Sequence, residues 1–435
     1  MATVELLLLN PMNAAFAEID ITPQLPCEKP GWIVKILANA VDDPLMANVA
    51  VLDDGKTRSA IVSLDILSVR WPMAEAIRDA AEKLGIPRGN VLVAATHNHT
   101  GPPVSAPGLA TKDPIYIAQL VTKVGQALAQ AVANLQPVHV GIASGIEGRV
   151  SFIRRCIMKD GSVKTHPFGP EIRCAEGAID PEVGVISIQN EAGKTLGLIV
   201  NFTCHPVHGG GEPRLSAGWP GVLRETIKRS LGTDVTTVFL NGALGDTHHE
   251  NPLRADAVDT NNKQRVGDLL ASTVLNMLPQ MKHETSLSLF TSRKTIKVPY
   301  RDIDGPLGEN FKLRQRFAPD HIYETLIAKL RTKHAKRDHA LAEIQAIRID
   351  ENTAFVSLPA EAFSAIGLKI KSASPFKRTY IIAPANGIIG YVPTAEAFDR
   401  GGYETTLSMG SKLAPQAAQM LIETALEQLR SVAAK

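Results

Sequence analysis

Hydrophobic residues recur along this chain in two patterns, short apolar runs and longer stretches with apolar residues at helical spacing. The runs are typical of buried strands, and the longer stretches are typical of amphipathic helices. Strands and helices therefore alternate through the first two-thirds of the chain, which predicts an α/β fold. Strands are predicted at 59–64, 90–96, 138–143, 184–189, 196–203 and 236–240, and helices at 71–84, from 114 onward, at 221–231 and at 262–277.

The last third of the chain has a different pattern. Residues 287–300 predict β structure, 323–344 a basic helix, and 415–429 a final amphipathic helix. Two runs, 345–349 and 353–358, predict a hairpin. No stretch has the composition of an interdomain linker, and no repeat is evident. We therefore expect residues 1–435 to form a single catalytic domain, with the C-terminal third, 287–435, packed back onto the rest.

Charge and composition narrow the classes of partner. The 435 residues include 46 basic and 44 acidic side chains, so a net charge of +2 gives no reason to expect nucleic acid or an acidic membrane surface. Four scattered cysteines do not predict a disulfide framework. The leucine run at 6–9 is shorter than a secretion-signal core, and no run approaches the ~18 apolar residues of a membrane span. We expect a cytoplasmic protein that acts on a small molecule; a homo-oligomer stays open.

Candidate chemistry begins where the strand at 90–96 ends. His97 and His99 follow it, and Gly101 and Pro102 then open a loop. Side chains alternate in extended chain, so the two imidazoles should leave the strand end on the same side. Such a pair suits a metal or proton-transfer site. A satisfied surface pair is the alternative.

Two more strand ends carry similar residues. The strand at 196–203 is followed by His205 and His208, and the strand at 236–240 is followed by Asp246, His248 and His249. Ligands of α/β sheets bind at the carboxyl ends of the strands. Three strands that each deliver histidine or aspartate there predict one shared site.

Other common chemistries lack their motifs. The chain has no Gly-x-Ser-x-Gly elbow, no phosphate-binding Gly-x-x-x-x-Gly-Lys-Ser/Thr loop and no His-Glu-x-x-His pair. Metal-assisted chemistry remains, with imidazole and carboxylate ligands brought together from distant strands.

Six segments, spread over almost the whole chain, carry a resemblance to a known family. They are Ala17-Glu18-Ile19-Asp20-Ile21-Thr22-Pro23, Thr96-His97-Asn98-His99-Thr100-Gly101-Pro102, Phe202-Thr203-Cys204-His205-Pro206, Asn241-Gly242-Ala243-Leu244-Gly245-Asp246, Leu358-Pro359-Ala360-Glu361 and Gly390-Tyr391-Val392-Pro393-Thr394. Together, and in the family order, they resemble the neutral/alkaline, non-lysosomal ceramidases. The chain is similar to a short member that holds the catalytic domain without the immunoglobulin-like C-terminal domain. The resemblance implies an α/β zinc-hydrolase domain built on a mixed sheet, like the N-terminal domain of neutral ceramidase.

The resemblance implies one Zn²⁺ per chain, held by His97, His205, Glu361 and Tyr391, although other divalent metals accept the same ligands. Zinc would polarise a carbonyl oxygen and lower the pKa of a water toward ~7. His99 would stand beside the metal as a proton shuttle or as a hydrogen-bond donor to the oxyanion.

The chain also departs from the family pattern. His248 stands where the ceramidase loop carries a serine, so Asp246, His248 and His249 become the candidates for acid, base or extra ligand. Gly218 stands where an acid is expected. Arg154 and Arg155 resemble an Asn-Arg segment of the family. One of them would hold the substrate, a role we assign to Arg155, although a surface salt bridge is the default for such a pair.

These observations predict a zinc-dependent hydrolase, of amidase or lactonase type, that cleaves an amide, ester or lactone of a small polar metabolite. Two alternatives stay open. One is a zinc lyase or isomerase that works through a metal-stabilised enolate, and the other is a degenerate member that binds a ligand without turnover. A second metal near His208 or Asp65 also stays open.

Overall fold

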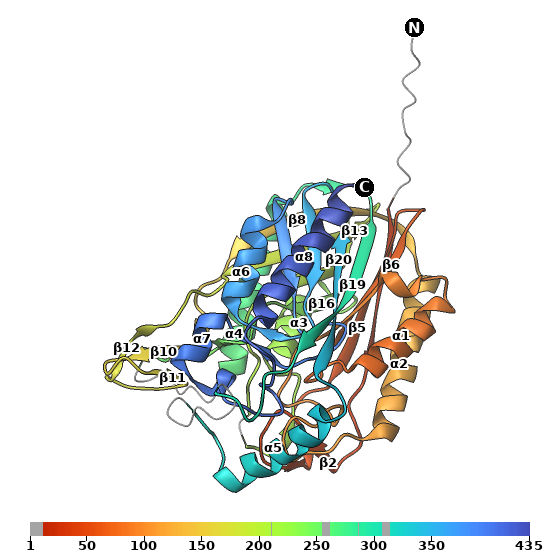
Figure 1. Ribbon diagram of the computed structural model, residues 1–435. Helices are drawn as coiled ribbons and strands as arrows, with labels where there is room; N and C mark the ends of the chain where they lie inside the picture. The colour runs from red at the N-terminus through yellow and green to blue at the C-terminus, as the bar shows by residue number, and fades with distance from the viewer. Residues whose placement is uncertain (1–11, 210, 255–261, 286, 307–313) are drawn as a thin grey trace.

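Two β-sheets lie face to face, and helices cover the outer side of each (Figure 1). The structure is a computed structural model that describes residues 12–209, 211–254, 262–285, 287–306 and 314–435. Within these residues the larger sheet has the strand order β16-β14-β13-β8-β1-β5-β6-β7, with β18 beside β8. The smaller sheet has the order β19-β20-β21-β23.

The strands of the larger sheet are β1 Asn13–Asp20, β5 Met46–Asp53, β6 Arg58–Leu64, β7 Val91–Ala95, β8 Gln136–Ile146, β13 Glu182–Asn190, β14 Thr195–Phe202, β16 Thr236–Asn241 and β18 His283–Glu284. The smaller sheet contains β19 Phe290–Pro299, β20 His339–Arg348, β21 Thr353–Ser357 and β23 Arg378–Ile382. Short strands outside the two sheets are β2 Cys27–Lys29, β3 Ile36–Ala38, β4 Ala40–Val41, β9 Phe152–Ile153, β10 Arg155–Met158, β11 Val163–Thr165, β12 Ile172–Ala175, β15 Arg214–Leu215, β17 Thr247–His248, β22 Glu361–Ala362 and β24 Tyr391–Val392. The helices are α1 Trp71–Glu82, α2 Pro114–Ala133, α3 Gly218–Leu231, α4 Asn262–Met277, α5 Asp320–His334, α6 Ser364–Ala373, α7 Ala395–Arg400 and α8 Ala417–Ala433, with 3₁₀ turns η1 Arg88–Asn90, η2 Leu278–Gln280 and η3 Tyr403–Thr405.

Alternation along the strands explains why the two sheets stack. On β5, Val49 and Val51 pack toward α1 and α2, whereas Ala50 and Leu52 pack into the layer shared with the smaller sheet. In the smaller sheet Phe355 enters that shared layer, and its neighbours on β21 pack under α6 and α8. Strands covered on both faces read as continuous apolar runs, which is how they appear in the sequence.

The predicted α/β fold with a mixed sheet is confirmed. Strands β6 and β7 are parallel, as are β14 and β16, whereas β1, β5, β8 and β13 pair with antiparallel neighbours. The helix predicted over 323–344 is wrong beyond His334, because β20 begins at His339. Ala340, Ala342 and Ile344 are buried on the face toward α8, so packing in the sheet outweighs the helical propensity of this stretch.

The C-terminal third lies against the larger sheet. Ile347, Phe355 and Ile382 share an apolar cluster with Ala50 and Ile186, and α8, dark blue in Figure 1, covers the far side of β19 and β20. The single-domain organisation stays a prediction.

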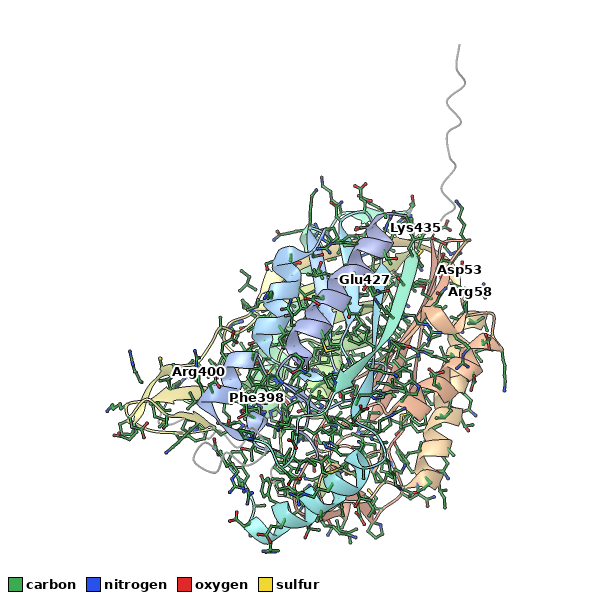
Figure 2. All side chains as sticks on the ribbon, in the orientation of Figure 1. Asp53, Arg58, Phe398, Arg400, Glu427 and Lys435 are labelled. Atoms are coloured by element: carbon green, nitrogen blue, oxygen red, sulfur yellow. The ribbon has the colours of Figure 1, made fainter. Side chains whose placement is uncertain are left out.

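Ion pairs secure the periphery of both sheets. Figure 2 shows Asp53 beside Arg58 at the turn between β5 and β6, where the charged atoms lie 2.7 Å apart. Glu427, on the outer face of α8, pairs with Lys294 of β19 at 2.7 Å. No helix within the described residues is long and apolar enough to cross a membrane. The leucine run at 6–9 lies outside those residues.

The carboxyl ends of four strands meet at one place. Ser63, near the end of β6, donates a hydrogen bond to the carbonyl of Phe239 on β16. The side-chain amide of Asn241, the last residue of β16, donates to the carbonyls of Thr96 and Cys204, which follow β7 and β14. The loops that carry His97, His205 and Asp246 are therefore tied together by buried hydrogen bonds.

Candidate metal centre

Three histidines turn the same ring nitrogen toward one point. Nε2 of His99 lies 3.3 Å from Nε2 of His97 and 3.0 Å from Nε2 of His205. Within the described residues they form the group of histidine, cysteine or acidic side chains whose ligand atoms lie close enough to hold a metal ion, all within 4.8 Å. His97 and His205 are buried, and His99 is partly exposed.

The backbone at His97 brings the first two rings together. β7 ends at Ala95, and His97 has a φ of 65°, in the left-handed region that residues other than glycine rarely adopt. A turn at His97, rather than the alternation of an extended strand, therefore places its side chain. Strained backbone of this kind is concentrated at functional sites.

Backbone carbonyls fix the tautomers of the first two rings. Nδ1 of His97 lies 2.8 Å from the carbonyl oxygen of Leu67, and Nδ1 of His99 lies 2.9 Å from that of Gly31. Each Nδ1 must carry the proton to donate there, so each Nε2 presents a lone pair. A carbonyl that accepts from the second ring nitrogen is the usual partner of a metal-bound histidine.

His205 can adopt the same tautomer. Its Nδ1 lies 3.2 Å from the carbonyl of Leu244, and Nη1 of Arg154 stands at 3.3 Å. Donation to Leu244 directs the Nε2 lone pair toward the other two rings. Burial, and then the neighbouring His97, lower the pKa of His99 to about 3, whereas burial and Arg154 lower the pKa of His205 well below its ordinary value. Neutral imidazoles are the form that binds a metal.

Glu361 and Tyr391 stand beside the histidines. They are opposite one another in the short parallel pair β22 and β24. Oε2 of Glu361 lies 3.4 Å from Nε2 of His97. Burial opposes the charge of Glu361, but the hydrogen bond from Tyr391 is among the contacts that lower its pKa, so its carboxylate is charged. Burial, and then Glu361, raise the pKa of Tyr391 well above its usual range, which keeps the phenol protonated.

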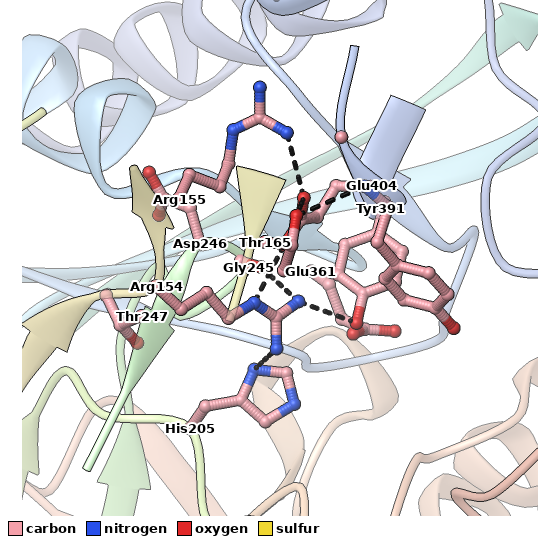
Figure 3. A network of polar contacts seen from close by, with 12 residues as sticks. Arg154, Arg155, Thr165, His205, Gly245, Asp246, Thr247, Glu361, Tyr391 and Glu404 are labelled. Carbon is pink, nitrogen blue, oxygen red and sulfur yellow. Dashed lines mark hydrogen bonds and ion pairs between the residues drawn. The ribbon is translucent and has the colours of Figure 1, made fainter. Parts of the chain in front are cut away.

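Arg154 lies beside Tyr391 and contacts its hydroxyl (Figure 3). Its guanidinium donates to the hydroxyl oxygen of Tyr391 at 3.1 Å, to the carbonyl of Gly245 at 2.9 Å and to Glu404 at 2.8 Å. Burial opposes its charge, but Tyr391 and Glu404 raise the pKa of Arg154 above its usual range. Arg154 is thus a fixed cation that orients Tyr391.

The sequence assigned substrate binding to Arg155, but the structure brings Arg154 to the histidines. Arg155 is fully buried and is held by Glu176 and by Glu404, the latter at 2.9 Å. Adjacent residues on an extended segment point to opposite sides, and this alternation separates the two. The sequence did not predict a role for Glu404, because no motif includes it and its partners, Arg154 and Arg155, lie about half a chain away.

Asp246, His248 and His249 lie behind the histidine cluster. The carboxylate of Asp246 accepts from the backbone and hydroxyl of Ser364, and burial raises its pKa to about 6. His249 stacks on His248, with ring centres 4.2 Å apart, and its Nδ1 lies 3.5 Å from the carbonyl of His205. None of the three is among the described residues that line the neighbouring cavity. Their catalytic roles stay predictions.

Within the described residues, neither Asp65 nor His208 belongs to a second group of side chains that could hold a metal ion. Both carboxylate oxygens of Asp65 accept from Arg224, and one also accepts from the amide of Met46 at 2.9 Å. His208 stacks on His249 with ring centres 3.9 Å apart.

A cavity of about 250 Å³ opens onto the cluster. His97, His99, Glu361 and Tyr391 form part of its wall. Sites for drug-sized ligands measure about 300–1,000 Å³, so the space fits a small molecule. The ionisable groups therefore face a place where a substrate can bind.

The fold matches solved structures although sequence comparisons find nothing. No protein-family model and no curated protein matches the chain. The neutral ceramidase from Pseudomonas aeruginosa is similar in structure, with a TM-score of 0.76 and 17% identity over 98% of this chain and 75% of that one. A ceramidase complexed with C2 is similar too, with a TM-score of 0.76 and 17% identity over 97% and 75%. The predicted likeness to the neutral ceramidase fold is confirmed.

Proposed function

We propose that this chain is a metal-dependent hydrolase that cleaves an amide, ester or lactone bond of a small polar molecule. The observation that carries the proposal is the convergence of three Nε2 atoms beside Glu361, two of them on rings whose only proton is given to a carbonyl. Lone pairs and a carboxylate gathered in a buried place repel one another unless a cation lies between them.

His97, His99, His205 and Glu361 would hold the ion, with Tyr391 beside them. Neutral imidazoles with one carboxylate suit zinc, although manganese and iron accept the same ligands. When bound, the metal would supply Lewis-acid polarisation of a carbonyl and would make a water more acidic. The carbonyls of Leu67 and Gly31 hold the rings in orientation, which fixes the geometry before substrate arrives.

Tyr391 would act on the substrate in the same reaction, with Arg154 as the residue that positions it. The hydroxyl oxygen of Tyr391 accepts from Arg154, so its own proton is free to be donated. In the free protein that proton is directed to Glu361. Tyr391 lines the cavity, so the same proton can stabilise negative charge that develops on a carbonyl oxygen, as other oxyanion-binding donors do.

The likeness of fold supports amide cleavage among the three bond types. A ceramidase acts by its name on ceramide, and ceramide is an N-acyl amide. The cavity of this chain is about 250 Å³. We therefore propose a smaller and more polar amide as substrate here.

Elemental analysis tests the proposal first. Protein purified without added metal is compared with His205→Ala and with His321→Ala, an exposed histidine on α5. About one ion per chain in wild type and in His321→Ala, lost in His205→Ala, is the expected result. Wild-type protein that stays folded and takes up no zinc, manganese or iron would contradict it.

A screen of amides, esters and lactones then decides the reaction class. Turnover that stops on chelation and returns with metal supports the hydrolase. Solvent exchange of a substrate α-proton without cleavage would instead support a lyase or isomerase. Tight binding without any turnover would support a ligand-binding protein.

A further inference from the structure

The cavity beside the histidines has a second set of charged groups. Arg70 precedes α1, Lys333 lies on α5, and Lys412 lies in the loop before α8. All three line the same cavity as His97 and Glu361. We call these three residues the cationic wall.

Lys412 is a buried ammonium without a carboxylate partner. Its side chain is 5% exposed, and Nζ donates to the carbonyls of Ile389 at 2.6 Å and Met409 at 3.0 Å. Burial, and then Lys333 and Arg70, lower its pKa to about 7. In its protonated form the group has three donors, so one N–H is left after these two bonds.

Arg70 and Lys333 add to this charge instead of balancing it. No ion pair joins either of them to a carboxylate in the part of the chain that the structure describes. Burial, and then Arg70, lower the pKa of Lys333. Arg70 is exposed, and Lys333 is partly buried over the ring of Tyr300, 6.0 Å from its centre. Lys412 is the buried cation of the three, and unlike the buried Arg154, which is paired with Glu404, it has no carboxylate partner. A buried cation that faces a cavity without such a partner is costly, and groups of this kind are characteristic of a ligand site.

The acidic side chains that line the cavity do not balance the positive charge of the cationic wall. Among the described residues that line it, Glu361 is the acidic one, and its carboxylate belongs to the proposed metal set. A bound divalent ion would use that negative charge and leave the wall still more positive. An anionic ligand would therefore balance positive charge that the described lining of the cavity leaves unbalanced.

A buried hydroxyl gives an independent indication of a ligand. Ser105 lines the same cavity, is 3% exposed, and its Oγ has no hydrogen-bond partner. Buried polar atoms of native proteins are almost always hydrogen-bonded, and exceptions need an explanation. A bound ligand with acceptor oxygens could accept from Ser105 or from the remaining N–H of Lys412, since both residues line this cavity.

We infer that the substrate carries an oxyanion group, a carboxylate or a phosphate, that binds to the cationic wall while the bond to be cleaved lies at the histidines. This inference rests on the proposed hydrolase function and names the substrate class within it: a small amide, ester or lactone with an acid group, such as an N-acyl amino acid. Ceramide has no such charge, so the wall would also separate this chain's substrates from neutral lipids.

Binding of matched probes tests the inference. Isothermal titration calorimetry, with the metal-loaded and the chelated protein, compares N-acetylglycine, N-acetyl-β-alanine and N-acetyl-4-aminobutyrate with their carboxamides. Monoamides of succinic and glutaric acid place the charge on the acyl side, and N-acetylethanolamine phosphate replaces carboxylate by phosphate. We expect the best anionic probe to bind at least about tenfold tighter than its neutral partner, the difference that one charge-assisted hydrogen bond gives. More salt should reduce this difference.

Substitutions in the cationic wall test whether its residues cause the tighter binding of the anionic probes. Arg70→Met and Lys333→Met should bring the anionic probe to within about twofold of its carboxamide, a loss that follows from removing the charge partner. Lys336→Met, which removes an exposed lysine in the turn after α5, should leave the preference unchanged. Equal binding of anionic and neutral probes to the wild type, or an anionic preference that survives both wall variants, would overturn the inference.

The outcomes separate this inference from the proposed function. If the protein binds metal and hydrolyses the carboxamides as well as the acids, the proposed hydrolase function is supported and the inference of an anionic substrate is overturned. If the protein prefers the anionic probes through the cationic wall, yet takes up no metal and cleaves nothing, the anion site is supported and the hydrolase function is overturned.

Discussion

Nε2 of His97 lies 3.3 Å from Nε2 of His99, although the only proton of each ring is given through Nδ1 to a carbonyl. Two lone pairs thus face one another at close range beside the carboxylate of Glu361. Native structures seldom leave acceptors in this arrangement, because each loses a hydrogen bond that water would supply. A cation between them removes the conflict, which is why the pair indicates a metal centre more directly than the motif does.

The role of His99 can be decided by substitution. If its Nε2 is a ligand, His99→Asn should lower metal affinity as much as His97→Asn does, and by more than the roughly 10–100-fold that loss of an outer hydrogen-bond partner causes. Titration against a competing chelator measures this, with His321→Asn as the exposed control. A variant that keeps its metal and loses only turnover would instead assign His99 to proton transfer, the role expected from the sequence.

Arg154 and Arg155 should behave differently despite their shared partner Glu404. Arg154→Met removes the donor to Tyr391, so we expect metal affinity or activity to fall about 10- to 100-fold. Arg155→Met should lower the free energy of unfolding by about 3–5 kcal/mol, because it breaks a buried ion pair, and should leave metal affinity unchanged. Urea unfolding and chelator titration on both variants make the comparison. Equal loss of metal affinity in the two would contradict the distinction.

The sequence predicted those parts of the molecule that local pattern controls. The strand ends before His97, His205 and Asp246 could be read from apolar runs, and their convergence followed from the rule that ligands bind at the carboxyl ends of strands. The structure brings His97 and His205 together as that reasoning expected.

Other parts depend on contacts that no local pattern records. The helix predicted over 323–344 is wrong beyond His334, where β20 forms instead because α8, some eighty residues later, covers that strand. The cationic wall joins Arg70, Lys333 and Lys412 from three distant segments, each of which reads as an ordinary solvated charge in the sequence. Arg154 could have been separated from Arg155 by strand alternation alone, had the start of β10 been known.

Gly245 should tolerate no side chain. A Cβ there would overlap the carbonyl oxygen of Glu361, and the backbone amide of Gly245 donates to Ala362 at 2.8 Å. Gly245→Ala must therefore displace the strand that carries Glu361. We expect a loss of about 1–3 kcal/mol in the free energy of unfolding and a weaker metal site. Gly148→Ala, where a Cβ would meet nothing within 4 Å, is the control. A Gly245→Ala protein with wild-type stability and metal content would show that the contact is not restrictive.

The stability of the metal-free protein should fall in acid. Burial lowers the pKa of His99 and of His166 to about 3 and that of His249 to about 4, against an ordinary value near 6.5. Below pH ~6.5 the unfolded chain binds more protons than the folded one, so each histidine reduces stability by up to about 1.4 kcal/mol per pH unit. Asp246, whose pKa is raised to about 6, acts in the opposite direction between pH ~3.9 and 6. Burial also raises the pKa of Asp65 and of Glu250, but these three carboxyls are outnumbered by the histidines whose pKa is lowered. Urea unfolding at pH 7, 6 and 5 should show this slope.

His166→Asn should reduce the slope, because it removes one histidine whose pKa is lowered. Asparagine tolerates the φ of 53° at that position, so the variant should keep the local backbone. A stability that is constant from pH 7 to 5, or that rises toward acid, would mean that these histidines are not held neutral by the fold.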